Sequence, residues 1–318
     1  KRRRGNLLQR YRSGAPNQNG VPVRQDAKCG FRVAGSGGML AASCPVAYVT
    51  YFQEDLSDAH AVNLAVSTAL QTSAAGRGWT VLGAHSGEKD LSQLIEKLLA
   101  ARVWGIVLDC VDPKILAQLR AADLPVVMTN SWFEDVDVDS VLQDNYRGGF
   151  QAAQYLVRSG AQRIAWLGPV GQFSASRERF AGAVAGLAAS GRAFAPEAIL
   201  DVSGQSAQPR LEELMSGSER PDGLLVFWKG LARVLKTVCD ERDIAPGRDL
   251  TLVGWAVEEF YEMEHSSTYA GGAVPPAVVW RAGDMAQAAL DRLEARRRGL
   301  ESSPARISVP TRIRRQVR

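Results

Sequence analysis

Histidine and cysteine are scarce in this chain of 318 residues. Three histidines, His60, His85 and His265, lie far apart, and neither a G-x-S-x-G nor a P-loop pattern occurs. The four cysteines stand singly at positions 29, 44, 110 and 239, without the C-x-x-C spacing of a metal or redox site. These absences argue against an enzyme, a metal centre or a resident cofactor.

Long apolar runs are also missing. No stretch approaches the ~20 apolar residues that a membrane-spanning helix needs, and the first residues lack the apolar core of a secretory signal. We therefore expect a cytoplasmic protein. The chain has 46% hydrophobic and 23% charged residues. Its length of 318 residues exceeds what one hydrophobic core usually supports, which predicts two lobes.

Basic residues concentrate at the start of the chain. Seven of them precede the first acid, Asp26, and because the whole chain carries +4, the remainder carries −3. The run Lys1, Arg2, Arg3 and Arg4 could contact DNA phosphates, or it could belong to a solubilising tail. Residues 1–45 are rich in small and polar residues, which predicts a flexible arm or linker, or the end of an upstream DNA-binding module.

From Val46 onward, apolar strand patterns alternate with amphipathic helix patterns. The predicted strands are 46–51, 79–82, 105–108, 125–128, 140–142, 163–167, 198–200, 223–226, 250–253 and 307–309. The predicted helices are 59–75, 91–101, 113–122, 148–159, 176–190, 211–215, 230–241 and 279–297. Strands and helices in alternation at this interval predict parallel βαβ units and an α/β fold.

Four segments occur in a specific order. These are 144–169 (DNYRGGFQAAQYLVRSGAQRIAWLGP), 177–182 (RERFAG), the Pro-Asp-Gly at 221–223 and 244–254 (IAPGRDLTLVG). In this order they resemble the effector-binding region of LacI/GalR-family transcriptional regulators. The resemblance implies a type I periplasmic-binding-protein-like fold, with two Rossmann-like lobes of parallel sheet joined by three crossovers. We expect lobe 1 at 46–145 plus 272–299 and lobe 2 at 146–271 plus 305–314, with crossovers near 144–147, 270–274 and 300–306.

The resemblance also implies two effector-binding residues. Asp144 matches an acid that contacts effector, and Arg177 matches an arginine that donates paired hydrogen bonds to sugar hydroxyls, a role that suits the planar guanidinium. Asp144 could instead cap a helix, and Arg177 could be a surface residue paired with an acid. Phe52 and His85, which follow the first two predicted strands, are further candidates.

The chain departs from the family at two contacts. Trp228 and Lys229 stand where the family usually has Asn-Asp, and Trp255 and Ala256 stand where it has an aromatic residue followed by Asp. Indole faces and a cation favour a flat, aromatic or anionic ligand, although stacking on a carbohydrate remains open. The tryptophans could equally fill the space between the lobes, with effector binding lost.

The resulting functional prediction is the effector-sensing domain of a transcriptional regulator of the repressor type. It would bind a small molecule between its lobes and couple lobe closure to DNA binding by a homodimer. The family's helix-turn-helix is not found in residues 1–45, so we expect DNA binding through a missing or upstream module. Helices around 91–99 and 278–290 could pair subunits or be ordinary core. The alternative function is a solute-binding protein of a transport or signalling system with the same fold.

Overall fold

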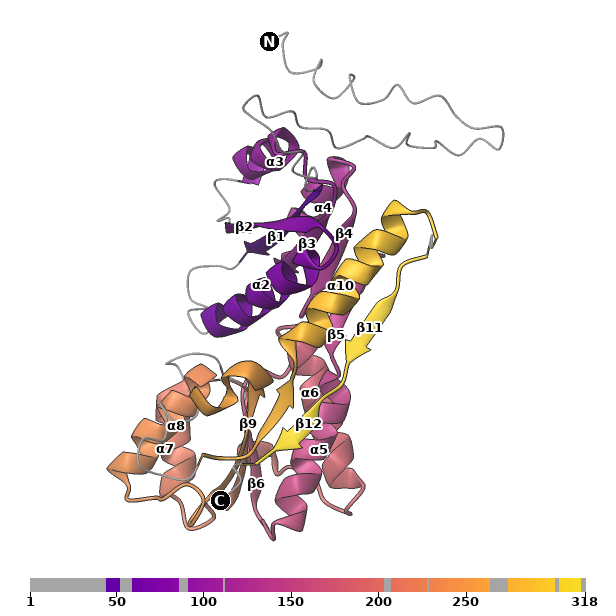
Figure 1. Ribbon diagram of the computed structural model, residues 1–318. Helices are drawn as coiled ribbons and strands as arrows, with labels where there is room; N and C mark the ends of the chain where they lie inside the picture. The colour runs from indigo at the N-terminus through magenta and orange to yellow at the C-terminus, as the bar shows by residue number, and fades with distance from the viewer. Residues whose placement is uncertain are drawn as a thin grey trace, which may run out of the picture. The chain divides into compact units, whose positions relative to one another are not determined.

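The computed structural model describes residues 44–51, 59–85, 91–110, 112–202, 207–227, 229–263, 274–300 and 303–315. These residues belong to a unit that runs from Pro45 to Arg318, apart from Cys44, which begins its first strand. The strands of this unit form two sheets of six strands each, and each sheet is flanked by helices (Figure 1). The two-lobed α/β architecture predicted from the strand and helix alternation is therefore confirmed.

The first sheet has the strand order β11-β5-β4-β3-β1-β2. Its strands are β1 (Cys44–Tyr51), β2 (Trp79–His85), β3 (Ile106–Cys110), β4 (Val126–Thr129), β5 (Asp139–Gln143) and β11 (Arg306–Val309). The run from β1 through β3, β4 and β5 to β11 is parallel. One apolar cluster joins it to α2 (Ala59–Ala75) and α10 (Ala282–Arg297), and another joins it to α3 (Leu91–Ala100) and α4 (Pro113–Ala121). The core thus lies on both faces of this sheet.

The second sheet has the order β12-β10-β9-β8-β6-β7. Its strands are β6 (Ile164–Leu167), β7 (Ile199–Leu200), β8 (Gly223–Val226), β9 (Thr251–Val257), β10 (Ala277–Trp280) and β12 (Arg312–Arg314). They are parallel except for the antiparallel β12. Helices α5 (Asn145–Arg158) and α6 (Ser174–Ala188) pack together on one side, and α7 (Ala207–Ser216) and α8 (Lys229–Glu241) on the other (Figure 1).

Two parts of the predicted lobe division are corrected. Residues 277–280, predicted in lobe 1, form β10 of the second sheet, where Ala277 pairs with Gly254. Residues 306–309, predicted in lobe 2, form β11 of the first sheet, where Arg306 pairs with Ser140. The predicted helix over 279–297 is also too long, because its first residues belong to β10 and α10 begins at Ala282. An unbroken apolar run fits a buried strand as well as a helix, and this explains the error.

The chain passes between the sheets at three places. The first crossover follows β5 at Asp144, as predicted. The second lies at Arg281 between β10 and α10, so its predicted place near 270–274 was wrong. The third lies at 310–311 between β11 and β12, and not near 300–306 as predicted. The backbone N–H of Asp144 donates to the Val309 carbonyl at 2.9 Å, and the Thr311 hydroxyl donates to the Asp144 carbonyl at 3.1 Å. The first and third crossovers are therefore hydrogen-bonded side by side.

Glycines bring α5 and α6 into close contact. A Cβ atom at Gly182 would lie 1.9 Å from the carbonyl oxygen of Tyr146, and one at Gly149 would lie 2.1 Å from that of Arg179. Real Cβ contacts are never so short, so only glycine fits at either position. This approach fixes the first turns of α6 against the amino end of α5, and it is these turns that carry the charged residues of the site.

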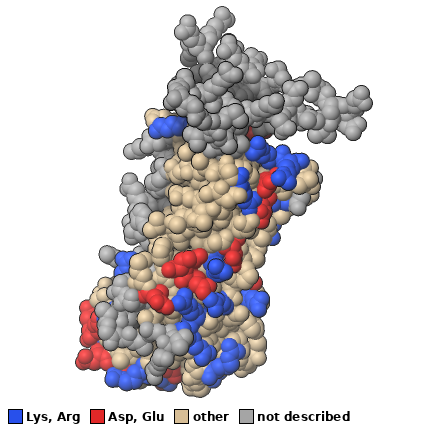
Figure 2. All heavy atoms as spheres, viewed as in Figure 1, with Lys and Arg blue, Asp and Glu red and all other residues tan. Residues whose placement is uncertain are grey.

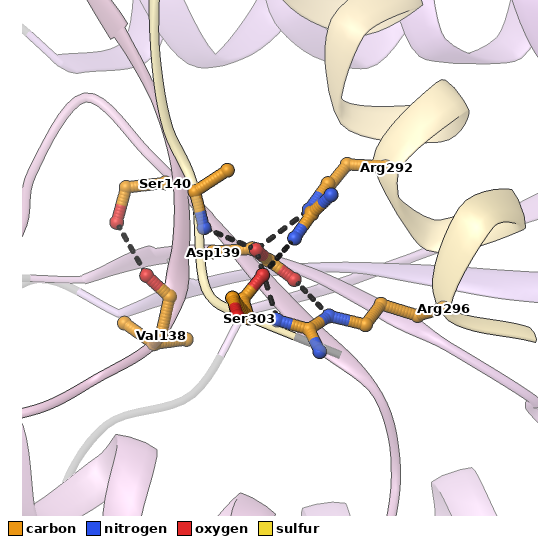
Figure 3. A network of polar contacts seen from close by, with 7 residues as sticks. Val138, Asp139, Ser140, Arg292, Arg296 and Ser303 are labelled. Atoms are coloured by element: carbon orange, nitrogen blue, oxygen red, sulfur yellow. Dashed lines mark hydrogen bonds and ion pairs between the residues drawn. The ribbon is translucent and has the colours of Figure 1, made fainter. Parts of the chain in front are cut away.

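A buried ion pair fixes α10 to the first sheet. Asp139, at the start of β5, accepts hydrogen bonds from Arg292 Nε at 2.6 Å, Arg296 Nε at 2.5 Å and the Ala305 N–H at 2.8 Å. Figure 3 shows both arginines reaching from α10 to this carboxylate. Burial alone would raise the pKa of Asp139, but the Arg296, Ala305 and Arg292 hydrogen bonds outweigh burial and hold it below its usual value. Arg296, in the last turn of this helix, thus has a structural partner.

The helices named as possible dimer surfaces turn their apolar sides inward. Leu94 and Leu98 of α3 lie in the cluster beneath the first sheet, and the apolar residues of α10 lie in the cluster on its other face. These faces belong to the core. Leu64 on α2 and Leu82 on β2, by contrast, are large apolar side chains of the first lobe that are exposed to solvent.

Candidate effector site

In the view of Figure 2, side chains of both charges are interspersed over the lower part of the described surface and along its right edge, whereas the face above is mostly uncharged. Surface pairs such as Arg77 with Asp291 and Arg314 with Glu262 contribute little to stability, because water screens them. The informative charges are buried. They lie near the ends of β3, β5 and β8, and the carboxyl ends of parallel strands are the edge at which open α/β sheets bind ligands.

Arg179, in the second turn of α6, is the central buried cation of this region and is 7% exposed. Its Nε donates to Asn145 Oδ1 at 2.9 Å, one terminal nitrogen to the Phe227 carbonyl at 3.2 Å, and the other to Gln143 Oε1 at 2.9 Å. Burial lowers the pKa of Arg179 to about 9, and the neighbouring Glu178 opposes that shift. The side chain thus connects the end of β5, the start of α5 and the end of β8.

Two aromatic rings pack against this guanidinium. Its central carbon lies 3.8 Å from the ring centroid of Trp255 and 4.5 Å from that of Phe227. The Trp255 indole also donates to Gln143 Oε1 at 2.6 Å. Its ring occupies the space that a Cβ at Gly148 would need, 2.4 Å from Trp255 Cη2. Trp255 therefore holds both Arg179 and its acceptor in place, and a cation–π contact in a dry environment contributes on the order of 2 kcal/mol.

A chain of amide side chains continues from Arg179 into the first lobe. Gln143 Nε2 donates to Asn130 Oδ1 at 3.0 Å, and Asn130 Nδ2 donates to Asp109 Oδ2 at 2.6 Å. Asp109 is the penultimate residue of β3 and is 3% exposed. Burial raises its pKa to about 7, although hydrogen bonds from Asn130 and Tyr48 act in the opposite direction. Asn130 has a φ of 62°, a conformation that asparagine adopts more readily than most residues. The network thus ends at a carboxyl group that titrates near neutral pH.

Trp132, two residues after Asn130, also joins the two lobes. Its backbone N–H donates to Ser174 Oγ at 3.2 Å, and its indole donates to Glu178 Oε1 at 2.8 Å. Asn145 Nδ2 donates to the other oxygen of Glu178 at 3.2 Å. The Arg306 guanidinium lies 3.5 Å from the centroid of the Trp132 ring. The loop after β4 is therefore docked on the amino end of α6, beside the arginine network.

The predicted site residues fall in different surroundings. Trp255 lies in the buried network beside Arg179. Asp144 accepts the Arg147 N–H at 3.1 Å and caps α5. Arg177 pairs with Glu134 at 3.0 Å with 40% of its side chain exposed. The effector-binding roles of these three residues stay predictions, and for Asp144 and Arg177 the structure also shows the cap and the surface pair that were their alternatives.

Several predicted residues lie outside the described part of the chain. Phe52, Trp228 and the basic run Lys1, Arg2, Arg3 and Arg4 are among them. His85 ends β2 and Lys229 begins α8, but their side chains are likewise outside what the structure describes. Their proposed contacts with effector or DNA stay predictions.

Arg179 was not singled out from the sequence, although a signal for it exists. It stands three residues before Gly182, four before Ala183 and seven before Gly186, and this spacing places it on the face of α6 that packs inward. Arg177 is two residues away and so lies on a different face. No comparable signal marks Gln143, Asn130 or Asp109, because their partners come from separate strands and loops.

The described residues contain neither a metal site nor a membrane-spanning helix. Within the ranges set out above, no group of three or more His, Cys, Asp or Glu side chains is arranged to hold a metal ion. No helix among those residues is both long and apolar enough to cross a bilayer.

The parallel sheets, the three crossovers and the buried polar network at the strand ends define a two-lobed ligand-binding domain. A family model described as periplasmic binding proteins and sugar binding domain of LacI family matches residues 60–222, and one described as periplasmic binding protein-like domain matches residues 153–316. The chain belongs to this family of periplasmic binding proteins and LacI-type sugar-binding domains.

Curated relatives and solved structures agree with this assignment. The ribose operon repressor of Haemophilus influenzae is 23% identical over 170 residues, which cover 52% of this chain and 51% of that protein. The maltose regulon regulatory protein MalI of Escherichia coli is 30% identical over 131 residues, 40% of this chain and 37% of that protein. The chain thus spans about half the length of the first of these relatives and less of the second.

Solved structures match over more of the chain. A structure of the transcriptional regulator CelR in complex with cellobiose superposes with a TM-score of 0.72 at 21% identity, covering 85% of this chain and 83% of that one. A lac repressor dimer bound to operator and the anti-inducer ONPF superposes with a TM-score of 0.68 at 20% identity, covering 86% and 81%. At these identities the likeness shows a shared fold.

Proposed function

We propose that this chain is the effector-sensing domain of a transcriptional repressor, and that a small molecule binds between its lobes at Arg179. The observation that carries the proposal is the buried network that runs from Asp109 through Asn130 and Gln143 to Arg179. It joins the carboxyl ends of strands from both sheets. A ligand that displaces or completes these contacts would change the balance between two arrangements of the lobes.

The coupling needs only a modest free energy. A ligand shifts two arrangements according to its differential affinity for them. A coupling of ~1–3 kcal/mol changes the affinity at a second site from several-fold to about a hundredfold. Trp132, Glu178 and Asn145 sit on the joint between the lobes, so their contacts are the ones that we expect to differ between the two arrangements.

The whole protein's partners are part of the proposal. The relatives are named as repressors, not enzymes, and one solved neighbour is described as a dimer on its operator. We propose that this domain likewise works in the cytoplasm as a homodimer, and that its lobe movement is coupled to a DNA-binding module. Lys1, Arg2, Arg3 and Arg4 would add weak phosphate contacts. A dimer through the first lobes would cover Leu64 and Leu82.

The effector site is tested by ligand binding to matched variants. The whole chain is screened by thermal shift against sugars, sugar phosphates, purines and aromatic acids, and any compound that stabilises it is titrated by calorimetry. Arg179→Ala should weaken binding at least tenfold, whereas Arg158→Ala, an exposed arginine on α5, should not. Arg177→Ala decides whether the second arginine also takes part. Equal affinities for Arg179→Ala and Arg158→Ala would refute the proposed site, and turnover of a bound compound would refute the assignment as a sensor.

A further inference from the structure

Arg179 carries a buried positive charge without a carboxylate in direct contact among the described residues. Its three acceptors are the amide oxygens of Asn145 and Gln143 and the carbonyl of Phe227, and all three are neutral. Glu178 is adjacent in sequence, but its oxygens accept from Trp132 and Asn145. Glu178 therefore acts on Arg179 through space, without a hydrogen bond to the guanidinium.

The other acid on the network does not balance the charge either. Asp109 is two amide side chains away from Arg179, and burial raises its pKa to about 7. Near and below neutral pH it carries a proton for much of the time, so its negative charge is partial as well as remote. The strand end that bears Trp255 continues with Ala256 and Val257, which bring no charge.

An isolated charge inside a protein is costly. Hydrogen bonds to neutral groups and contact with aromatic rings offset part of the cost, but a paired opposite charge offsets more. The guanidinium has five N–H donors, and its three hydrogen bonds to the protein leave two N–H groups without a described acceptor. Two N–H groups on a planar cation suit the paired oxygens of a carboxylate or a phosphate.

We propose that the effector is an anion, a small polar molecule whose carboxylate or phosphate group pairs with Arg179. This inference rests on the proposed function, since it names the chemistry of the molecule bound at that same site. A neutral sugar would leave the buried charge uncompensated, whereas an oxyanion would bring the missing negative charge to it. Trp255 would then lie against the rest of the ligand or turn aside to admit it.

The test compares neutral and charged forms of the same molecule on the whole chain. Calorimetry measures glucose, gluconate and glucose 6-phosphate as one set, and ribose, ribonate and ribose 5-phosphate as another. We expect the tightest member of a set to be charged and to bind at least tenfold better than the neutral sugar. We also expect its affinity to fall as NaCl rises from 50 to 500 mM. Comparing the carboxylate with the phosphate member of each set shows which of the two groups is bound more tightly.

Variants of Arg179 link the preference to this side chain. Arg179→Met should remove the preference for the charged form, Arg179→Lys should keep part of it, and Arg158→Met should leave it unchanged as a matched loss of an exposed arginine. Circular dichroism checks that each variant folds. If Arg179→Met does not fold, the proposal is tested by the affinities of wild type for the neutral and charged forms and by those of Arg179→Lys. If a neutral sugar bound as well as its charged forms, the proposal of an anionic effector would be refuted, whereas the proposal that the domain senses an effector would stand. Binding of no member, in these sets or in the broader screen, would overturn both.

Discussion

Asp109 offers the sharpest prediction of stability against pH. In the unfolded chain an aspartate has a pKa near 3.8, whereas in the folded protein burial raises the pKa of Asp109 to about 7. Between these two values the folded state holds a proton that the unfolded state has released. The free energy of unfolding therefore falls as pH rises through this range, and this part of the stability is lost once pH passes 7.

The magnitude follows from the two pKa values. Because each pH unit corresponds to 1.36 kcal/mol, the rise from 3.8 to about 7 gives a full effect of about 4 kcal/mol. The interval from pH 5 to pH 8 captures about 3 kcal/mol of it. The Asp109→Asn variant has no proton to lose and keeps an oxygen that can accept from Asn130. Its stability relative to wild type should therefore rise by about 3 kcal/mol over this interval.

Urea unfolding at pH 5, 6, 7 and 8, followed by tryptophan fluorescence, measures this difference. Other acids, including Asp139, titrate alike in both proteins and cancel when the two curves are subtracted. Asp135→Asn serves as a matched control, because it makes the same change at an exposed position of the same lobe and should give a flat difference. A flat difference for Asp109→Asn as well would show that the carboxyl group is not buried as described.

Four further changes test other parts of the structure. Gly182→Ala should lower the free energy of unfolding by roughly 1–3 kcal/mol, because its Cβ would meet the Tyr146 carbonyl, whereas Gly283→Ala on α10, with open space around it, should not; denaturation curves distinguish them. Asp139→Asn should cost roughly 3–5 kcal/mol in the same assay by leaving Arg292 and Arg296 without their carboxylate, and a loss below 1 kcal/mol would contradict the buried pairing. Trp132→Ala removes the contacts with Glu178 and should change calorimetric effector affinity several-fold with a small change in stability; unchanged affinity would place this joint outside the coupling. Leu64→Asp should convert a dimer to a monomer in sedimentation velocity, and an unchanged dimer would exclude α2 from the interface.

Most of the fold could be predicted from the sequence because its strands and helices are strongly periodic and separated by clear breaks. The exceptions are short apolar runs at the crossovers. Residues 277–280 are apolar throughout and buried, so nothing in their pattern separates a strand from the first turn of the helix that follows. The assignment of β10 and β11 to opposite sheets depends on pairing partners that lie far away in sequence.

The candidate site was less accessible to prediction. The segment from 177 to 182 was recognised as part of the family resemblance, but the resemblance directed attention to Arg177 and not to Arg179. Helical spacing distinguishes the two, since only Arg179 shares a face with the glycines that pack against α5. The amide chain of Asn130 and Gln143 could not be inferred, because a buried network depends on distances between side chains from separate strands.

Hydrogen–deuterium exchange on the whole chain tests the central claim most directly, using whichever of the paired sugars, sugar acids and sugar phosphates binds most tightly. A ligand held between the lobes at Arg179 should slow exchange in segments of both lobes together, at residues 128–132 of the first lobe and at 174–180 and 225–227 of the second. Protection confined to one lobe, or to residues remote from Arg179, would contradict it.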